Sequence, residues 1–467
     1  MSLVIWPHRL HPLLHAIVAH PLHMNAQNTP PQNSPAPTSP LTPPASLAST
    51  VPTFLASPAR KFRVILAGGG TGGHLYPGLS IAQALQAQLG DSLELIWAAT
   101  PRPVDQRLLS SFGPRYIRQP VQPLQKNIKK LWAFWKGWFQ SCRYWKAAFA
   151  TTPVDAVVAL GGYAAGPAAY IASKRGIPVI LLNPDALPGL ANRFLLRRSN
   201  LVITQWPLSP DYHEVVRGRT LALGCPIRTD LLNRTRPQAA AQLNLDPSLK
   251  TLVITGASLG AKTINDALLA LLHNAEFRKV FEPAPADAPT ALHATIPAPE
   301  IDHPHLEIGT PPQQWQILHL AGLDQAAEVR AAYAKFPLLR ATILDYCDDM
   351  ASVWAIADLA IARAGASTCA ELTACGIPSI LLPYPYHKDL HQRANALELA
   401  RAGAAIIVDD EKNAAANAPA VKNALLPLLY DSVVRERMAD AARAAGKPDA
   451  AQNIATEILA LIAPKMR

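Results

Sequence analysis

The sequence predicts an α/β protein with two doubly wound domains, each built on a parallel sheet and facing the other across a cleft. Apolar runs of strand length alternate with amphipathic runs of helical length from Lys61 onward. Two such series follow one another, and glycine-rich loops come directly after strands in both. We expect strands at 62–67, 93–98, 156–160, 179–182 and 201–204 in the first series, and at 251–255, 341–344, 359–362, 379–382 and 405–408 in the second.

The 467 residues divide into four expected parts. Residues 1–60 contain no Asp or Glu and many Pro, Ser, Thr and Ala, so we expect a mostly disordered tail. An N-terminal domain is expected at 61–225 and a C-terminal domain at 226–449. The second domain contains a Pro/Ala-rich stretch at 282–312 that is typical of a surface insertion. The last part, 450–467, has the pattern of a helix.

Composition narrows the class of protein and of partner. The formal net charge of +10 favours an anionic partner, which leaves nucleic acid, an acidic membrane surface and a phosphorylated substrate open. The five cysteines are scattered, which argues against a disulfide framework or structural zinc and favours a reduced cytoplasmic compartment. The uncharged run 156–173 contains glycines and a proline, so we read it as strand, loop and helix and expect no transmembrane helix.

The first expected strand runs into the glycine-rich loop 68–74, and we expect a helix from about Pro77 to Gln88. Such a loop before a helix is typical of a phosphate site, because glycines allow close approach and the helix end offers free N–H groups. The spacing also satisfies the dinucleotide fingerprint of dehydrogenases. Dehydrogenases have an acidic residue after the next strand, but this sequence has Thr100-Pro101-Arg102 at that position. A second loop of the same kind lies at 161–167.

The C-terminal series repeats this arrangement. A third phosphate-binding candidate lies at 256–261, and Arg228 near the expected hinge has the charge to neutralise a diphosphate. Glu371 follows a Gly/Ser/Thr loop and suits recognition of ribose hydroxyls. His387 and His391 are four apart, but no Glu or Cys completes a metal motif, so we expect no metal site.

Taken together and in order, these segments resemble the MurG family of bacterial glycosyltransferases, in glycosyltransferase family 28. The matching segments, which cover most of 61–410, are GGGTGGH, GGYAAGP, GLANR, GCPIR, GASLGAKTIND, YCDDM, RAGASTCAEL and PYPYHKDLHQRANALELARAGAA. The resemblance implies the GT-B architecture and a metal-independent, inverting transfer of GlcNAc from UDP-N-acetylglucosamine to lipid I, undecaprenyl-diphosphate-MurNAc-pentapeptide, which yields lipid II. It implies no cofactor, a peripheral position at the cytoplasmic face of the inner membrane, and other cell-wall synthesis proteins as further partners.

The resemblance also implies site residues. His74 would be the general base, although positioning the acceptor phosphate competes as its role. Donor-binding residues would be Thr71, Gly72, Gly73, Asp185, Arg228, Ser258, Gly260, Cys347, Ser367, Thr368, Glu371, Gln392 and Asn395. Acceptor-binding residues would be Gly70, Thr71, Gly73, His74 and Tyr163.

Some segments depart from the family pattern. Leu182-Asn183-Pro184-Asp185 stands where the family has HEQN, so Asp185 replaces an asparagine associated with the sugar site. The family's GGSQG appears as 256–260 without its glutamine, and His391 replaces a second glutamine. These changes leave two alternatives open, namely a related GT-B enzyme with a different acceptor and a non-catalytic scaffold that binds sugar nucleotides or membranes.

The stretch 126–149 combines aromatic and basic residues and contains no acid. On a helix, this pattern suits the surface of an anionic bilayer. A helix that faces the protein core with a solvated basic side is the alternative, and no nucleic-acid fold accompanies the pattern, so we expect no nucleic-acid partner. The predicted membrane residues are Lys129, Trp132, Trp135, Lys136, Trp138 and Arg143.

Overall fold

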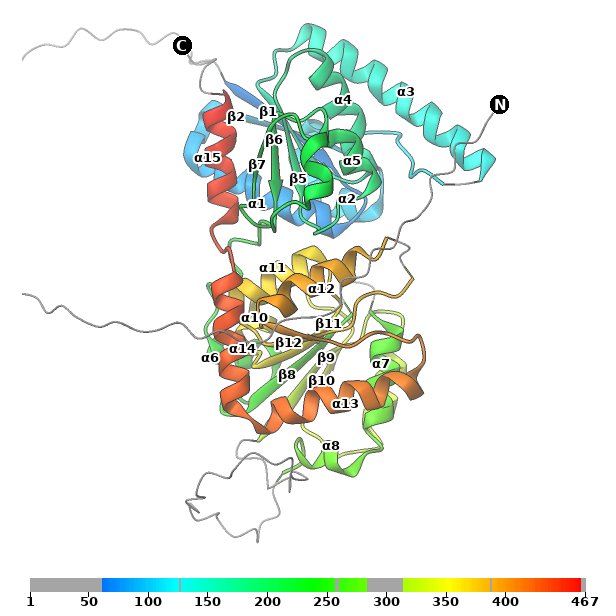
Figure 1. The fold of residues 1–467 in the computed structure, drawn as a ribbon, viewed down its shortest axis with the longest axis vertical. Coiled ribbons are helices and arrows are strands. Elements are labelled where there is room, and N and C mark those ends of the chain that lie inside the picture. The colour runs from blue at the N-terminus through cyan, green and yellow to red at the C-terminus, as the bar shows by residue number, and fades with distance from the viewer. Residues whose placement is uncertain (1–60, 126, 257–259, 284–313, 387–388, 463–467) are drawn as a thin grey trace, which may run out of the picture. The chain divides into compact units, whose positions relative to one another are not determined.

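The structure is a computed structural model that describes residues 61–462 except 126, 257–259, 284–313 and 387–388. The expected tail 1–60 and nearly all of the expected insertion 282–312 therefore lie outside the described residues. The described part belongs to one unit of the chain, Pro58–Arg467. Within it, the chain forms two lobes, each with its own parallel sheet (Figure 1).

The first lobe contains a seven-stranded parallel sheet with the order β3-β2-β1-β4-β5-β6-β7. The second contains a six-stranded parallel sheet with the order β10-β9-β8-β11-β12-β13. The strands of the first sheet are β1 (Phe62–Gly68), β2 (Leu93–Ala99), β3 (Tyr116–Arg118), β4 (Ala156–Gly161), β5 (Val179–Asn183), β6 (Leu201–Thr204) and β7 (Arg219–Leu221). Those of the second are β8 (Lys250–Thr255), β9 (Trp315–Leu320), β10 (Ala341–Leu344), β11 (Leu359–Ala362), β12 (Ser379–Leu381) and β13 (Ala405–Ile407).

Helices cover both faces of each sheet. Those of the first lobe are α1 (Gly72–Leu89), α2 (Pro103–Leu109), α3 (Ile128–Thr151), α4 (Gly166–Lys174) and α5 (Leu190–Leu196). Those that follow are α6 (Arg236–Leu243), α7 (Lys262–Leu271), α8 (Ala275–Lys279), α9 (Ala326–Tyr333), α10 (Met350–Ile356), α11 (Ala366–Cys375), α12 (His391–Arg401), α13 (Ala414–Tyr430), α14 (Ser432–Ala445) and α15 (Ala450–Ile462).

The predicted parallel sheets are confirmed, and each expected strand is present with its ends shifted by one residue at most. Sequence reasoning missed β3, β7 and β9. The first two are three residues long, too short for a clear apolar run. The expected start of the first helix was wrong, because α1 begins at Gly72 and carries Pro77 inside it. Pro77 is the sixth residue of α1, so it removes the backbone hydrogen bond that residue 77 would donate to the carbonyl of Gly73.

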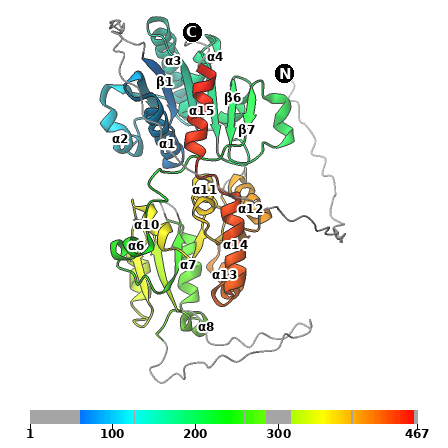
Figure 2. The same ribbon diagram turned by 90° about the vertical axis from the view of Figure 1, so that its left-hand side faces the viewer.

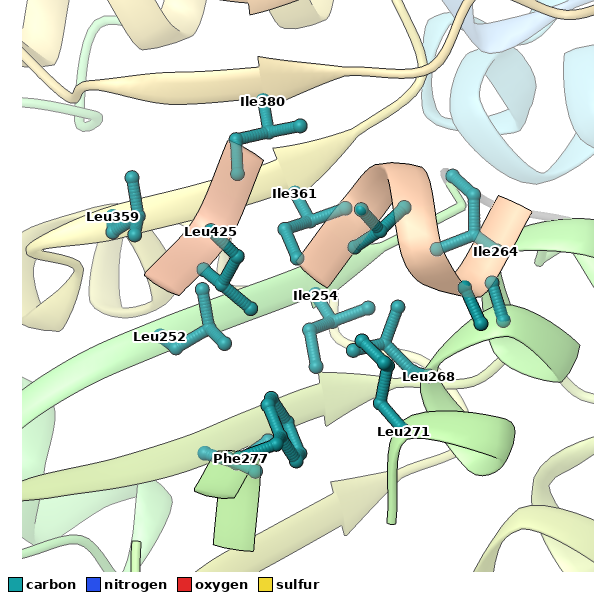
Figure 3. Packing of buried hydrophobic residues seen from close by; sticks show 14 of the residues in the cluster. Leu252, Ile254, Ile264, Leu268, Leu271, Phe277, Leu359, Ile361, Ile380 and Leu425 are labelled. Carbon is teal, nitrogen blue, oxygen red and sulfur yellow. The ribbon is translucent and has the colours of Figure 1, made fainter. Parts of the chain in front are cut away.

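Alternation along the strands builds a core on both faces of each sheet. In β1, Val64 and Leu66 pack towards α1, whereas Ile65 and Ala67 pack towards α3 and α4. In the second lobe, Leu252, Ile254, Leu359 and Ile361 of the central strands pack against α7 and α13 (Figure 3). Every one of these side chains is buried, so both lobes have an interior of their own.

The last helix, α15, does not pack on the second sheet, although it follows that sheet in the chain. Its Ile454 and Ile458 are fully buried in the core of the first lobe, with Ile81 and Leu85 of α1. Figure 2 shows α15 beside α1. The chain therefore returns to its first lobe at the end. The predicted division of the chain at 225/226 stays a prediction.

Both sheets reverse their strand order beside the first strand of the lobe. In the first sheet this point lies between β1 and β4, and Gly68 pairs with Gly161 at their carboxyl ends. In the second sheet it lies between β8 and β11, where Thr255 pairs with Ala362. Ligands of open α/β sheets bind outside the carboxyl ends of the strands at such a point. The predicted glycine-rich loops start at these four strand ends.

Candidate active site

The loop after β1 is held in place by a buried carboxylate. Asp105, on α2, accepts hydrogen bonds from the backbone N–H of Gly70 at 2.8 Å and from the N–H and hydroxyl of Thr100 at 2.8 and 2.6 Å. Gly70 has a φ of 86°, which favours glycine. Sequence reasoning looked for an acid directly after β2 and missed Asp105, because this carboxylate stands in the following helix and binds the loop.

The imidazole of His74 lies against the second glycine-rich loop. A Cβ placed on Gly161 would come within 3.1 Å of His74 Nδ1, and one on Gly162 within 3.0 Å of Nε2. Both glycines have positive φ values, 101° and 72°. Glycine is therefore required here for two reasons, since a side chain would strain the backbone and displace the ring.

Burial lowers the pKa of His74 below its usual value, and the negative charges of Asp185 and Asp105 oppose that shift. The ring is therefore neutral at neutral pH. The backbone carbonyl of Leu160, a hydrogen-bond acceptor for the ring, also opposes the shift. A neutral imidazole is suited to accept a proton.

A cavity of about 240 Å³ lies beside these loops and is lined from both sheets. The first lobe contributes the start of α1, and the second contributes the ends of β8 and β9 and residues after β10 and β11. The lining residues include Thr71, Gly72, Gly73, Tyr76, Arg228, Thr255, Cys347, Trp354, Ser367, Thr368 and Glu371. The cavity thus brings together residues that are separated by 300 positions in the chain.

Glu371 is the acidic group of this cavity on α11. Its Oε2 accepts a hydrogen bond from the indole N–H of Trp354 at 2.7 Å. Burial raises the pKa of Glu371, while Trp354 and Arg228 act in the opposite direction. The indole binds one carboxylate oxygen, and a carboxylate has further acceptor sites that can take hydrogen bonds from hydroxyls. Sequence reasoning did not single out Trp354.

Arg228 is the cation of the cavity. Its guanidinium donates to the backbone carbonyl of Asp348 at 2.7 Å and lies over the ring of Tyr76, 5.4 Å from the centroid. Helix α1 starts at the same cavity, and no side chain caps its first turn. A guanidinium and free helix N–H groups on one cavity favour a phosphate-bearing ligand.

Two family models match the chain. The model for the glycosyltransferase family 28 N-terminal domain matches residues 64–204, and that for the C-terminal domain matches 251–454. A protein of Desulfitobacterium hafniense is 32% identical over 401 residues, which cover 84% of this chain and 97% of that one. A protein of Salinibacter ruber is 32% identical over 413 residues, with coverages of 86% and 97%. Both are named UDP-N-acetylglucosamine–N-acetylmuramyl-(pentapeptide) pyrophosphoryl-undecaprenol N-acetylglucosamine transferase.

The chain belongs to the MurG family, within glycosyltransferase family 28.

Solved structures agree with the fold. The crystal structure of Acinetobacter baumannii MurG is 27% identical, with a TM-score of 0.59 over 85% of this chain and 99% of that one. The glycotransferase of kitacinnamycin, at 16% identity, has a TM-score of 0.57 over 86% and 99%. At that identity the second likeness concerns the fold alone. The two sheets of this MurG-family chain thus have the GT-B arrangement expected from the sequence.

The predicted sugar-binding residues lie at the junction between the lobes. Asn395, fully buried on α12, donates to Asp185 Oδ1 at 2.9 Å and to the carbonyl of Ala364 at 3.0 Å, and it accepts from the N–H of Ala186 at 2.8 Å. Its amide is therefore occupied by protein groups. Gln392 Oε1 accepts from the N–H of Tyr384 at 2.9 Å, which leaves its amino group available. Their contacts with a sugar stay predictions.

Other predicted positions can be placed as follows. Tyr163 lies over Gly70, with its hydroxyl 3.1 Å from where a Cβ would stand. Gly260 lies tightly against the carbonyl of Ala321, where a Cβ would come within 2.5 Å. Ser258 and His387 lie outside the described residues. Within the described ranges, no group of three or more His, Cys, Asp and Glu side chains is placed to hold a metal ion.

The amphipathic helix α3 has two different faces. Trp145 and Phe149 are buried in the first lobe, and Trp138 packs against Tyr170 and Phe194, with ring centroids 6.0 and 5.7 Å away. The predicted membrane residues Trp132 and Trp135 are 65% and 47% exposed. Lys129, Lys136 and Arg143 are also exposed.

The core-facing alternative therefore describes Trp138, Trp145 and Phe149, whereas the remaining predicted membrane residues are open to solvent. No helix within the described residues has the length and apolar character needed to cross a membrane.

Proposed function

We propose that this protein transfers N-acetylglucosamine from UDP-GlcNAc to lipid I, undecaprenyl-diphosphate-MurNAc-pentapeptide, and so forms lipid II. The names of the relatives support this substrate pair. The observation that carries the proposal is the cavity that joins Glu371, Arg228 and the uncapped start of α1, beside a neutral His74. The residues proposed to bind the nucleotide and the proposed proton acceptor thus lie next to each other, at a cavity lined by both lobes.

The donor half of the reaction follows from the cavity. The Glu371 carboxylate, held by Trp354, is suited to accept hydrogen bonds from the uridine ribose. Arg228, the start of α1 and the hydroxyls of Ser367 and Thr368 line the same cavity and would stabilise the charge that develops on the departing UDP. These groups perform that task in a transfer that uses no metal.

The acceptor half needs a base. The neutral imidazole of His74 would take the proton from the acceptor hydroxyl as its oxygen attacks C1 of GlcNAc. The bond between C1 and the UDP oxygen breaks on the opposite face, so the configuration at C1 inverts. The negative charge of Asp185 near the ring would stabilise the imidazolium that forms.

A lipid-linked acceptor requires a position at the membrane surface. Helices α3 and α5 carry large apolar side chains that are open to solvent and accompanied by basic ones. The exposed fractions are 84% for Ile128, 65% for Trp132, 65% for Phe139 and 75% for Leu190. Figure 1 shows α3 along the outside of the first lobe. Such a surface supports peripheral attachment to an anionic bilayer at the cytoplasmic face of the inner membrane.

The attachment can be tested by sedimentation with vesicles of anionic phospholipid, with zwitterionic vesicles as the comparison. The double variant Trp132→Ser, Trp135→Ser should lose most of its binding to the anionic vesicles. Leu338→Ser is the matched control, because Leu338 is 64% exposed on the second lobe. Equal binding by the double variant and wild type would reject this surface.

The function is tested by UDP release from UDP-GlcNAc with a lipid I analogue, in the presence of a chelator, for wild type and Glu371→Ala. Wild type should turn over, and the variant should lose donor binding. Glu436→Ala, an exposed acid on α14, serves as the control. If wild type binds UDP-GlcNAc but gives no product, lipid I is not the acceptor. The replacement of HEQN by residues 182–185 would then favour a related transferase with a different acceptor.

A further inference from the structure

The glycine-rich loop after β1 has an arginine on each of its two sides. On one side, Thr71, Gly72 and Gly73 line the donor cavity together with Arg228. On the other side, the carbonyl of Gly70 accepts a hydrogen bond from Arg102 Nη1 at 3.1 Å. Arg102 does not line the donor cavity. The glycine-rich loop thus lies between the guanidinium of Arg228 and that of Arg102.

The sequence around Arg102 holds its backbone in one conformation. Pro101 and Pro103 flank it, and its own φ and ψ are −68° and 149°, an extended conformation that precedes α2. A residue before proline is restricted to this region, and proline itself has a fixed φ. The N–H of Arg102 also donates to Thr100 Oγ1 at 3.3 Å. The backbone that carries the guanidinium is therefore largely ordered before any ligand arrives.

The side chain of Arg102 is exposed and keeps unused donors. Its guanidinium lies over the ring of Tyr163, 5.6 Å from the centroid, and one nitrogen bonds to Gly70. No carboxylate of the described residues is within ion-pair distance of it. The nearby Asp105 is already bonded to Gly70 and Thr100. A guanidinium has five N–H donors, so with its contacts to the Gly70 carbonyl and to Tyr163 it retains donors for an oxyanion.

The position of Arg102 indicates the class of ligand. In doubly wound nucleotide-binding domains, a residue near the end of the second strand contacts the ligand. An acidic residue there binds ribose hydroxyls, whereas an arginine binds a phosphate group. Here β2 ends at Ala99, and an arginine follows three residues later. The same side of the loop carries Tyr163, and His74 packs on the neighbouring Gly162. This side therefore suits a phosphate-bearing ligand next to the base.

We propose that Arg102 binds the diphosphate of the acceptor, while Arg228 serves the diphosphate of the donor. This inference rests on the proposed function, since that reaction brings two diphosphates to one site. The loop between the arginines keeps two like-charged groups apart, and each has its own cation. Arg102 is then a binding residue that determines which acceptors are used.

Steady-state kinetics test the proposal with two acceptors, the lipid-linked sugar diphosphate and an analogue with a single phosphate. Arg102→Ala should raise KM for the diphosphate acceptor about ten- to a hundredfold, with a much smaller change for the monophosphate. KM for UDP-GlcNAc should stay within twofold. Arg102→Lys should restore part of the loss, and Arg437→Ala, an exposed arginine on α14, should behave as wild type. Equal loss with both acceptors, or a raised donor KM, would overturn the proposal.

A binding measurement separates this proposal from the proposed function. Calorimetry with inorganic pyrophosphate, in the presence of saturating UDP to fill the donor cavity, should show binding to wild type and a loss of at least tenfold in Arg102→Ala. This result does not depend on turnover. If wild type binds pyrophosphate through Arg102 but does not use lipid I, the proposed function is rejected and the role of Arg102 in binding diphosphate is kept. Unchanged pyrophosphate affinity in the variant would remove the role of Arg102.

Discussion

The two lobes share a topology but prepare their sites in different ways. In the first lobe, backbone geometry shapes the site, because Gly70, Gly161 and Gly162 have positive φ values and Asp105 binds the N–H of Gly70. In the second lobe a side chain carries the recognition, because Glu371 projects into the cavity and Trp354 orients it. We therefore expect that the first lobe binds phosphate mainly through its backbone and that the second binds hydroxyls through a side chain. Four predictions test this difference, and they are ordered by the size of the expected effect.

The largest effect is expected at His74. His74→Asn should lower kcat about a hundred- to ten-thousandfold, because general-base catalysis contributes that much. In wild type, kcat/KM should fall as the pH drops through the pKa of His74, which burial places below the usual value of 6.5. The variant should lack this acidic limb. A pH–rate profile measures both, and an acidic limb that persists in the variant would assign the base to another group.

Asp105 should matter for stability as well as activity in the first lobe. Asp105→Ala leaves the N–H groups of Gly70 and Thr100 buried without their acceptor. We expect a loss of roughly 2–4 kcal/mol in the free energy of unfolding. Urea unfolding followed by tryptophan fluorescence measures it, with the exposed Asp91→Ala as a control. A loss equal to that of the control would mean that the loop keeps its shape without Asp105.

A buried histidine makes the second lobe sensitive to acid. His319 is hydrogen-bonded to Asn265 at 3.0 Å, and burial lowers its pKa from 6.5 to about 3. The unfolded state binds the proton at higher pH than the folded state, so stability falls as the pH drops from 6.5 towards 3. The slope from this group approaches about 1.4 kcal/mol per pH unit.

His319→Gln should be less stable than wild type at pH 7 and should lack this part of the pH dependence. The exposed His273→Gln should keep it. Unfolding free energies measured at several pH values between 4 and 7 make the comparison. Equal slopes in wild type and His319→Gln would show that other groups set the acid sensitivity.

The smallest effect is expected from the residue that orients Glu371. Trp354→Phe removes the indole N–H and should weaken UDP-GlcNAc binding about three- to tenfold. The indole hydrogen bond lowers the pKa of Glu371, so its loss should raise the pH below which donor affinity falls. Calorimetric titration with UDP-GlcNAc across pH measures both changes. An unchanged pH dependence would show that Trp354 serves packing alone.

The amphipathic helix α3 shows how far a sequence pattern reaches. Its aromatic and basic periodicity predicted a helix with an apolar side, and the helix is present. The pattern did not say which aromatics face the protein. Trp138 packs against Tyr170 and Phe194, residues that are distant in sequence, while Trp132 stays exposed. Periodicity shows which residues are apolar and share a helix face. Whether each one is buried depends on the neighbours that pack against it in the folded protein.

By itself, the sequence determined the two parallel sheets, the loops at their switch points and several of the residues that line the cavity, although not Trp354. Strand rhythm and glycine spacing are local properties, so they can be read along the chain. Only the tertiary structure decided which distant groups complete the site. Asp105 reaches back to Gly70, Asn395 crosses to Asp185, and α15 packs in the first lobe. The first two contacts form because buried polar groups need hydrogen-bond partners, and the third buries apolar side chains. Spacing in the sequence does not encode which distant groups meet.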